Sequence, residues 1–213
     1  AIKFQTYKAN TLASRYSPSY WDTDKEPTES QFKLFQKYDS FWEKEFKQLK
    51  KRCDQVGIEF LSTAFDAEAA RFLDEIMDVF KISSSDITNK PFIEYICEFG
   101  KPVILSTGAS DIDEIDRALF WIDSKAVPVA ILHCVLNYPT SEKNANLRMI
   151  TGLKKTYGDR IIGYSDHTMT DISGITAIAM GAKIIEKHFT IDKKLYGPDH
   201  RMSANPKELF DYF

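Results

Sequence analysis

Residues 103–122 have the sequence VILSTGASDIDEIDRALFWI and contain one strand and one helix in succession. The apolar run Val103–Leu105 ends in the hydroxyls of Ser106 and Thr107, as expected of a buried strand that stops at the edge of a sheet. After it, apolar side chains recur at helical spacing, at Ile112, Ile115, Ala118, Leu119 and Ile122. The stretch therefore predicts a strand followed by an amphipathic helix with one face on the core.

The same unit recurs along the chain. We expect strands at Ala1–Gln5, Ile58–Thr63, Val79–Ser83, Val103–Thr107, Pro128–Cys134, Arg160–Ser165 and Lys183–His188, each followed by a helix. This alternation predicts a parallel sheet covered by helices, either an open doubly wound sheet or a closed (β/α)8 barrel. The sequence has no glycine-rich phosphate loop, and the unit length of roughly 20–30 residues suits a TIM barrel.

The strand count carries a further expectation. Seven units are found where a barrel has eight, and the chain begins at Ala1 inside a strand without Met. We therefore expect an α/β chain, a (β/α)8 TIM barrel lacking its first strand–helix unit, with residues 1–213 as one domain. The irregular stretch Ala9–Thr28 is a candidate active-site loop. Ser40-x-x-Glu43 and Ser110-x-x-Asp113 are predicted to start helices, and Gly57 to end one.

Composition excludes several classes of protein. With 43% hydrophobic residues the chain is not disordered, and its net charge of −3 gives no footprint for nucleic acid or an anionic membrane. Its apolar runs are shorter than the roughly 18 residues that span a bilayer. Three cysteines in apolar surroundings predict buried, reduced thiols in a cytoplasmic protein.

Polar residues follow the apolar strands, where barrel chemistry takes place. Lys3 and Lys81 lie inside core strands, where an ammonium must meet an anion or lose its proton. An ion pair with Glu59 or Glu186, a bound phosphate or carboxylate, and a Schiff base are all open. The nearby hydroxyls favour an anion site and belong to Ser84, Ser106 and Ser165.

Two histidines, His167 and His188, end consecutive strands and are expected to be neighbours. Paired imidazoles can form a divalent metal site with open positions, or they can be ordinary loop histidines. A catalytic pair of His133 and Cys134 is disfavoured, because successive strand residues point to opposite faces.

Several segments match a known family in order across the chain. They are Ile2–Lys8, Lys81–Asp86, Ile104–Gly108, His133-Cys134 with Asn137–Thr140, Gly163–Thr168, Glu186–Thr190 and Gly197–His200. These segments resemble the sialic acid synthase family, which includes N-acetylneuraminate, legionaminate and pseudaminate synthases.

The resemblance implies a barrel enzyme that condenses phosphoenolpyruvate with an open-chain N-acetylated amino sugar and releases phosphate. A divalent ion, typically Mn2+ with Mg2+ or Co2+ as alternatives, would be held by His167 and His188. The implied phosphoenolpyruvate contacts are Lys3, Lys81, Ser84, Ser106 and Ser165. The implied sugar contacts are Gln5, Asp86, Tyr138 and Asp199. Lys3, Lys81, Glu186 and Asp199 are the expected catalytic residues, and the full-length protein is expected to be a homodimer.

The chain departs from the family pattern in three places. Val135-Leu136 replace polar residues after His-Cys, which removes one expected phosphoenolpyruvate contact. The first strand, with its catalytic Glu and Asn-His pair, and the C-terminal antifreeze-like domain are expected to be missing, so the chain is expected to be inactive by itself. A Schiff-base aldolase using Lys81 and an inactive barrel that binds a sugar or a protein remain alternatives. The sequence does not decide between N-acetylmannosamine and a diacetamido-trideoxyhexose.

Overall fold

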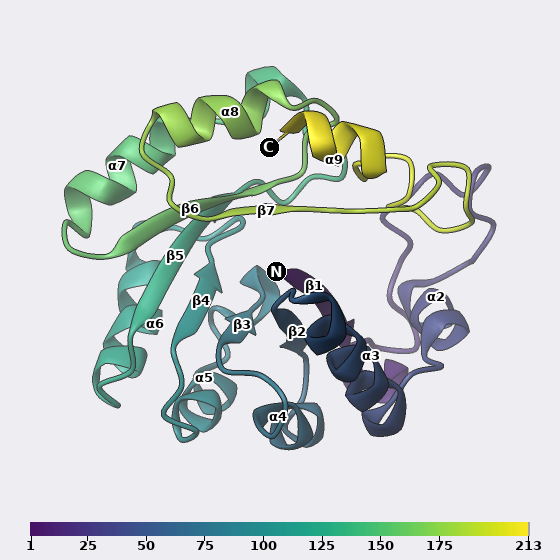
Figure 1. Ribbon diagram of the computed structural model, residues 1–213, viewed down its shortest axis with the longest axis horizontal. Helices are drawn as coiled ribbons and strands as arrows, with labels where there is room; N and C mark the ends of the chain where they lie inside the picture. Colours follow the sequence, from purple (N-terminus) through teal and green to yellow (C-terminus); the bar gives the residue numbers. More distant parts are fainter. Residues whose placement is uncertain (213) are drawn as a thin grey trace. The chain divides into compact units, whose positions relative to one another are not determined.

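The structure is a computed structural model that describes residues 1–212 (Figure 1). Within them, seven strands follow one another in the sheet in sequence order, from β1 to β7, and the registered pairs are parallel. Helices alternate with the strands, so the predicted strand–helix repeat of a TIM barrel is confirmed, and all seven strands lie where they were expected. The chain divides into two compact units, which are described separately.

The first unit comprises Ala1–Ile104 and Arg117–Pro128. Its elements are β1 (Ile2–Thr6), α1 (Ala9–Leu12), α2 (Gln31–Tyr38), α3 (Glu43–Val56), β2 (Phe60–Ala64), α4 (Ala67–Asp74), β3 (Phe80–Ile82), the 3-10 turn η1 (Ser84–Asp86) and α5 (Lys90–Cys97). It also holds the start of β4 (Val103–Ser106) and the end of α6 (Ile112–Asp123). Helices α3 and α4 pack beside β2, which buries Phe60 completely. Covering helices explain why these strands are apolar on both faces.

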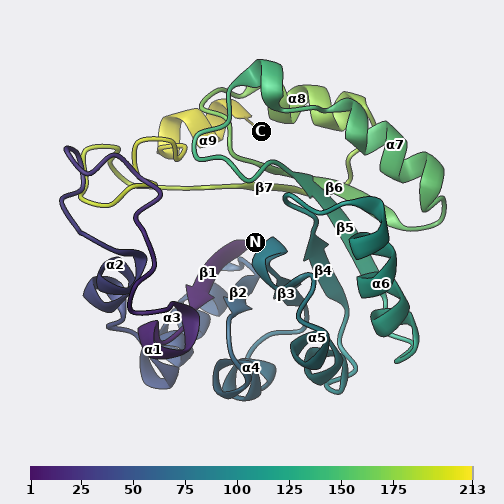
Figure 2. The same cartoon turned by 180° about the vertical axis from the view of Figure 1, so that it is seen from behind.

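The second unit comprises Leu105–Asp116 and Val129–Phe213, of which the structure describes all but the last residue. After the rest of β4 and the start of α6 come β5 (Val129–Cys134), η2 (Glu142–Asn144), α7 (Arg148–Thr156), β6 (Ile161–Asp166), α8 (Ile172–Ala179), β7 (Ile185–Lys187) and α9 (Pro206–Tyr212). Figure 2 shows α7 and α8 running beside β6, from the reverse side. The core of this unit includes Ile131, Leu132 and Ile150, each with no exposed surface.

Two helix starts differ from the prediction. Helix α3 is capped by Trp42 rather than Ser40: the Trp42 N–H donates to the carboxylate of Glu45 over 3.1 Å. This bond to the backbone of the cap residue needs an acid three residues after the cap, and Glu45 satisfies this spacing for Trp42. Ser40 instead closes a short turn on the carbonyl of Tyr38.

Helix α6 is capped by Asp111 rather than Ser110. The Asp111 carboxylate accepts from the Glu114 N–H over 2.8 Å, and the Glu114 carboxylate accepts from the Asp111 N–H over 3.1 Å. Two backbone donors at the helix start are thereby satisfied by one pair of acids, so the predicted start at Ser110 is wrong by one position.

Other local predictions are confirmed or corrected in part. Gly57 ends α3 in the left-handed conformation, with φ of 69°. The stretch Ala9–Thr28 is not irregular throughout, because it contains the short helix α1. All three cysteines, Cys53, Cys97 and Cys134, are buried thiols outside any disulfide. Among residues 1–212 no helix is long and apolar enough to cross a membrane.

Candidate functional site

The carboxyl ends of β6 and β7 place the two strand-end histidines side by side. Ser165 pairs with Glu186 and Asp166 with Lys187 in the parallel register, so His167 and His188 follow at the same level. Their ring centroids are 5.6 Å apart and the ring planes are inclined by 71°. This neighbourhood was expected from the sequence, because the register of adjacent parallel strands brings their ends together.

Hydrogen bonding fixes the tautomer of His167. Its Nδ1 lies 2.7 Å from the carbonyl oxygen of Val135, which can only accept, so Nδ1 carries the proton. Burial lowers the pKa of His167 to about 4, with a smaller effect of His188 in the same direction, while the Val135 carbonyl opposes the shift. His167 is therefore neutral at physiological pH and keeps the Nε2 lone pair for a ligand.

Tyr138, from the segment after β5, packs over both histidines. Its ring centroid lies 4.2 Å from that of His167 and 5.9 Å from that of His188. The same segment is joined to β6 by the Thr140 N–H, which donates to the His167 carbonyl over 2.9 Å. The three rings thus come from three successive strand ends and form one cluster.

Asp199 is the acidic neighbour of this cluster. Its Oδ2 lies 3.9 Å from Nδ1 of His188, which is an ion-pair distance and too long for a hydrogen bond. Desolvation raises the pKa of Asp199, and the nearby His167 and His200 oppose the shift. His200 itself lies 2.7 Å from the Thr190 hydroxyl through Nδ1, so it is held by a local contact.

Ser165 and Glu186 form a second layer next to His167. The Ser165 hydroxyl donates to Oε1 of Glu186 over 3.0 Å and lies 3.4 Å from Nε2 of His167. A serine hydroxyl, a carboxylate and an imidazole nitrogen therefore meet within one small volume. Ser106, at the end of β4, is buried in the same unit.

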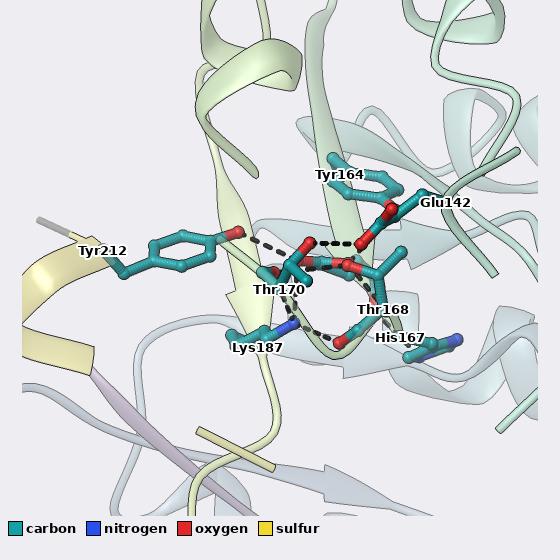
Figure 3. Close-up of polar contacts among 9 residues, drawn as sticks. Glu142, Tyr164, His167, Thr168, Thr170, Lys187 and Tyr212 are labelled. Atoms are coloured by element: carbon teal, nitrogen blue, oxygen red, sulfur yellow. Dashed lines mark hydrogen bonds and ion pairs between the residues drawn. The ribbon is translucent and has the colours of Figure 1, made fainter. Parts of the chain in front are cut away.

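Asp166 and Lys187 lie on the face of β6 and β7 opposite to Ser165 and Glu186. They form a buried ion pair with 2.9 Å between Oδ2 of Asp166 and Nζ of Lys187. Figure 3 shows Lys187 and Tyr212 directed toward this cluster from β7 and α9. Sequence reasoning assigned no role to these residues. For the ion pair, the one signal in the sequence is position: Asp166 immediately precedes His167, and Lys187 immediately precedes His188.

The side chains around His167 and His188 suit a metal ion only in part. Among residues 1–212, no group of three His, Cys, Asp or Glu side chains is arranged to hold an ion. His167 nevertheless has the feature of a ligating histidine, since its second nitrogen is bonded to a carbonyl that fixes the ring and the tautomer. Two imidazoles would leave most coordination positions to water or substrate.

In the first unit, the two predicted lysines lie on strands. Lys3 on β1 donates to the Thr63 hydroxyl over 3.3 Å. Lys81 on β3 is 5% exposed and donates to the Ile82 carbonyl over 3.1 Å. Thr63 is the register partner of both Gln5 and Lys81. Lys3 through its hydrogen bond, and Gln5 and Lys81 through strand register, therefore neighbour the same threonine.

Asp86 and Ser84 lie in the turn η1 that follows β3. The Asp86 carboxylate accepts from Asn89 over 3.1 Å and from Ser85 over 3.4 Å. Burial raises the pKa of Asp86, and these two hydrogen bonds oppose the shift. The carboxylate therefore has local partners within its own turn.

Comparisons with known proteins agree with the resemblance. The NeuB family model matches residues 1–212. The chain is 39% identical to an uncharacterized protein of Methanocaldococcus jannaschii, over 98% of this chain and 58% of the relative. It is 38% identical to N,N'-diacetyllegionaminic acid synthase of Campylobacter jejuni, over 98% of this chain and 64% of the relative.

The fold is also that of a solved relative. An N-acetylneuraminic acid synthetase from Leptospira borgpetersenii, crystallised with citrate, has a TM-score of 0.89 and 38% identity, over all of this chain and 70% of that one. The chain spans between 46% and 64% of the length of the curated relatives named in these comparisons.

Proposed function

The chain belongs to the NeuB family, and on that basis we propose that the protein condenses phosphoenolpyruvate with an open-chain N-acetylated amino sugar. Carbon 3 of the enol would attack the sugar aldehyde, water would add at carbon 2, and phosphate would leave by cleavage of its carbon–oxygen bond. The observation that carries this proposal is the family match over residues 1–212, together with two histidines that face each other at the ends of β6 and β7.

The proposed phosphoenolpyruvate ligands are Lys3, Lys81, Ser84, Ser106 and Ser165. A phosphate and a carboxylate need cations and hydrogen-bond donors, and these side chains are ammonium groups and hydroxyls. Support comes from Lys81, a buried lysine on β3, because an ammonium out of bulk water attracts an anion more strongly than one in water.

The proposed cofactor is a divalent ion, with Mn2+ as the first choice and Mg2+ or Co2+ as alternatives. His167 and His188 would hold it, His167 through Nε2 because Nδ1 is bonded to Val135. When bound, such an ion supplies Lewis-acid polarisation of the aldehyde oxygen.

Glu186 is proposed to handle the proton of the attacking water. Its carboxylate already accepts from Ser165, so it is oriented toward the residues next to His167. Asp199, whose pKa is raised by desolvation, is proposed as a catalytic group on the sugar side.

The acceptor is proposed to contact Gln5, Asp86, Tyr138 and Asp199. Tyr138 supports this choice, because it is 36% exposed and its ring lies against His167. We also propose that the full-length protein is a homodimer and that residues 1–213 act as one catalytic domain. The cytoplasmic location remains a prediction.

The test is release of inorganic phosphate from phosphoenolpyruvate by the full-length protein, because residues 1–213 are expected to be inactive by themselves. N-acetylmannosamine and the diacetamido-trideoxyhexoses should be compared as acceptors, with and without Mn2+. We expect phosphate release that requires both the metal and one of these sugars. Trapping of pyruvate on Lys81 by borohydride would instead indicate the Schiff-base aldolase.

The variant His167→Ala should lose metal-dependent turnover and keep its fold, measured by circular dichroism. The matched control is His133→Gln, because His133 is also a buried imidazole but is bonded to Ala145 rather than directed at His188. Unchanged turnover and metal content in His167→Ala would refute the assignment.

A further inference from the structure

A buried ion pair lies directly beside the two histidines. Asp166 has no exposed surface and the Lys187 side chain is 6% exposed. The two residues are register partners on β6 and β7, and His167 and His188 are the next residues on each strand. An interaction that holds the Asp166–Lys187 pair in place therefore also holds the backbone from which both imidazoles extend.

Both carboxylate oxygens of Asp166 accept more than one hydrogen bond. Oδ1 accepts from the Tyr164 hydroxyl over 3.2 Å and from the Thr168 N–H and hydroxyl, each over 2.8 Å. Oδ2 accepts from Lys187 over 2.9 Å and from the Tyr212 hydroxyl over 3.1 Å. A buried carboxylate with this many donors has one defined orientation.

Lys187 joins the same cluster to the segment that follows His167. Its ammonium donates to the carbonyl of Thr168, and to that of Thr170 over 3.5 Å. Figure 3 shows Thr168 and Thr170 grouped around Lys187, with His167 on the adjoining turn. A single side chain of β7 therefore binds both the carboxylate of the last residue of β6 and the backbone of the segment that follows it.

Tyr212 reaches this cluster from the distant helix α9 through a gap left by Gly174. A Cβ atom at Gly174 would lie 1.5 Å from the Tyr212 hydroxyl oxygen and 2.0 Å from Cζ. Tyr212 is itself 7% exposed. The absence of a side chain on α8 is thus what admits the tyrosine to Asp166.

We propose that Tyr212 is a positioning residue of the two-histidine site: its hydroxyl completes the Asp166–Lys187 pair and so fixes the strand ends that carry His167 and His188. The proposal rests on the proposed function in taking those histidines as metal ligands. Without the hydroxyl, the Asp166 carboxylate loses one of its two donors on Oδ2. The two imidazoles are then held less firmly at one separation, and the affinity for a divalent ion falls.

The experiment measures Mn2+ binding by the full chain, from the electron paramagnetic resonance signal of free Mn2+. Tyr212→Phe removes only the hydroxyl, and Gly174→Ala blocks the approach of the ring. We expect the dissociation constant to rise roughly 10-fold in each, the size seen when partners of metal ligands are changed. Asp166→Ala is avoided as the principal variant, because an unpaired buried ammonium can prevent folding.

Tyr157→Phe is the matched control. Tyr157 also donates its hydroxyl to an aspartate, Asp116, over 2.8 Å, but it lies on the loop after α7. It should bind Mn2+ as the unmodified chain does. The thermal midpoint of every variant is measured alongside, since a merely structural role of Tyr212 would lower the midpoint and leave Mn2+ affinity unchanged.

The outcomes separate the two proposals. If Mn2+ binds, depends on His167, and is unaffected by Tyr212→Phe and Gly174→Ala, the positioning role is overturned and the metal site stands. If the unmodified chain binds no Mn2+, or His167→Ala binds it as tightly, both the proposed metal site and the positioning role are overturned.

Discussion

His133 illustrates how burial sets the chemistry of a single residue in the second unit. The residue is 6% exposed, and its ring stacks on that of Tyr164 at a centroid distance of 5.7 Å. Nε2 lies 2.8 Å from the Ala145 carbonyl, so the neutral ring donates from Nε2. Burial lowers the pKa of His133, and the bond to Ala145 opposes the shift in part. The folded chain therefore resists protonation of a group that titrates near pH 6.5 when unfolded.

His133 should consequently contribute to acid sensitivity. As the pH falls below about 6.5, the unfolded chain takes up a proton that the folded chain does not, so the free energy of unfolding decreases. His133→Gln does not titrate, and its amide can still donate to Ala145. Between about pH 7.5 and about pH 5, the free energy of unfolding of the original chain should fall relative to that of His133→Gln. Urea unfolding across this range measures it, and a constant difference would contradict the prediction.

At the residue scale, the sequence predicted neighbours on one face of the strands and missed those on the other. His167 and His188 could be paired because strand register follows from the apolar pattern. The Asp166–Lys187 pair lies on the opposite face, where a charged pair in a strand has no sequence signature. Tyr212 could not be predicted at all, because it lies 46 residues from Asp166 and depends on a gap at Gly174.

At the element scale, the helix starts show which local signals are strong. Asp66 stands directly before α4 in the sequence, and its carboxylate accepts from the Ala69 N–H over 2.7 Å. The starts of α3 and α6 were misplaced, because several polar residues stand near each start and only the folded backbone selects one. Strands were predicted well because burial on both faces leaves continuous apolar runs.

The cap at Asp66 gives a test at this scale. Asp66→Ala removes the acceptor for Ala69 N–H and also the bond from the Thr11 hydroxyl. The loss should be about 1 kcal/mol of unfolding free energy. Asp66→Asn, which keeps a side-chain oxygen at the cap, is the matched control and should remain close to the original chain. Equal losses in the two variants in urea unfolding would show that the cap is not the source of the effect.

At the scale of the whole molecule, net charge bears on the binding proposed for phosphoenolpyruvate. The chain carries 28 basic and 31 acidic residues, so it offers no general attraction for phosphoenolpyruvate. Binding must then depend on individual cations in defined places. Under the proposed function the buried Lys81 on β3 is one such place, and Lys50, which lies on helix α3 in an ion pair with Asp54, is a matched lysine outside the proposed site.

Phosphoenolpyruvate should therefore stabilise the whole fold through Lys81. A ligand that binds only the folded chain adds about 2.7 kcal/mol when its concentration is a hundred times its dissociation constant. For a chain of this size that corresponds to a rise of about 5–10 °C in Tm. The rise should be lost in Lys81→Gln and retained in Lys50→Gln, each variant being compared with its own Tm in the absence of phosphoenolpyruvate. Since the shift is measured within each variant, a lower starting Tm does not obscure it. An equal rise in Lys81→Gln would mean that the lysine of β3 does not bind the anion, whatever its role in the sheet.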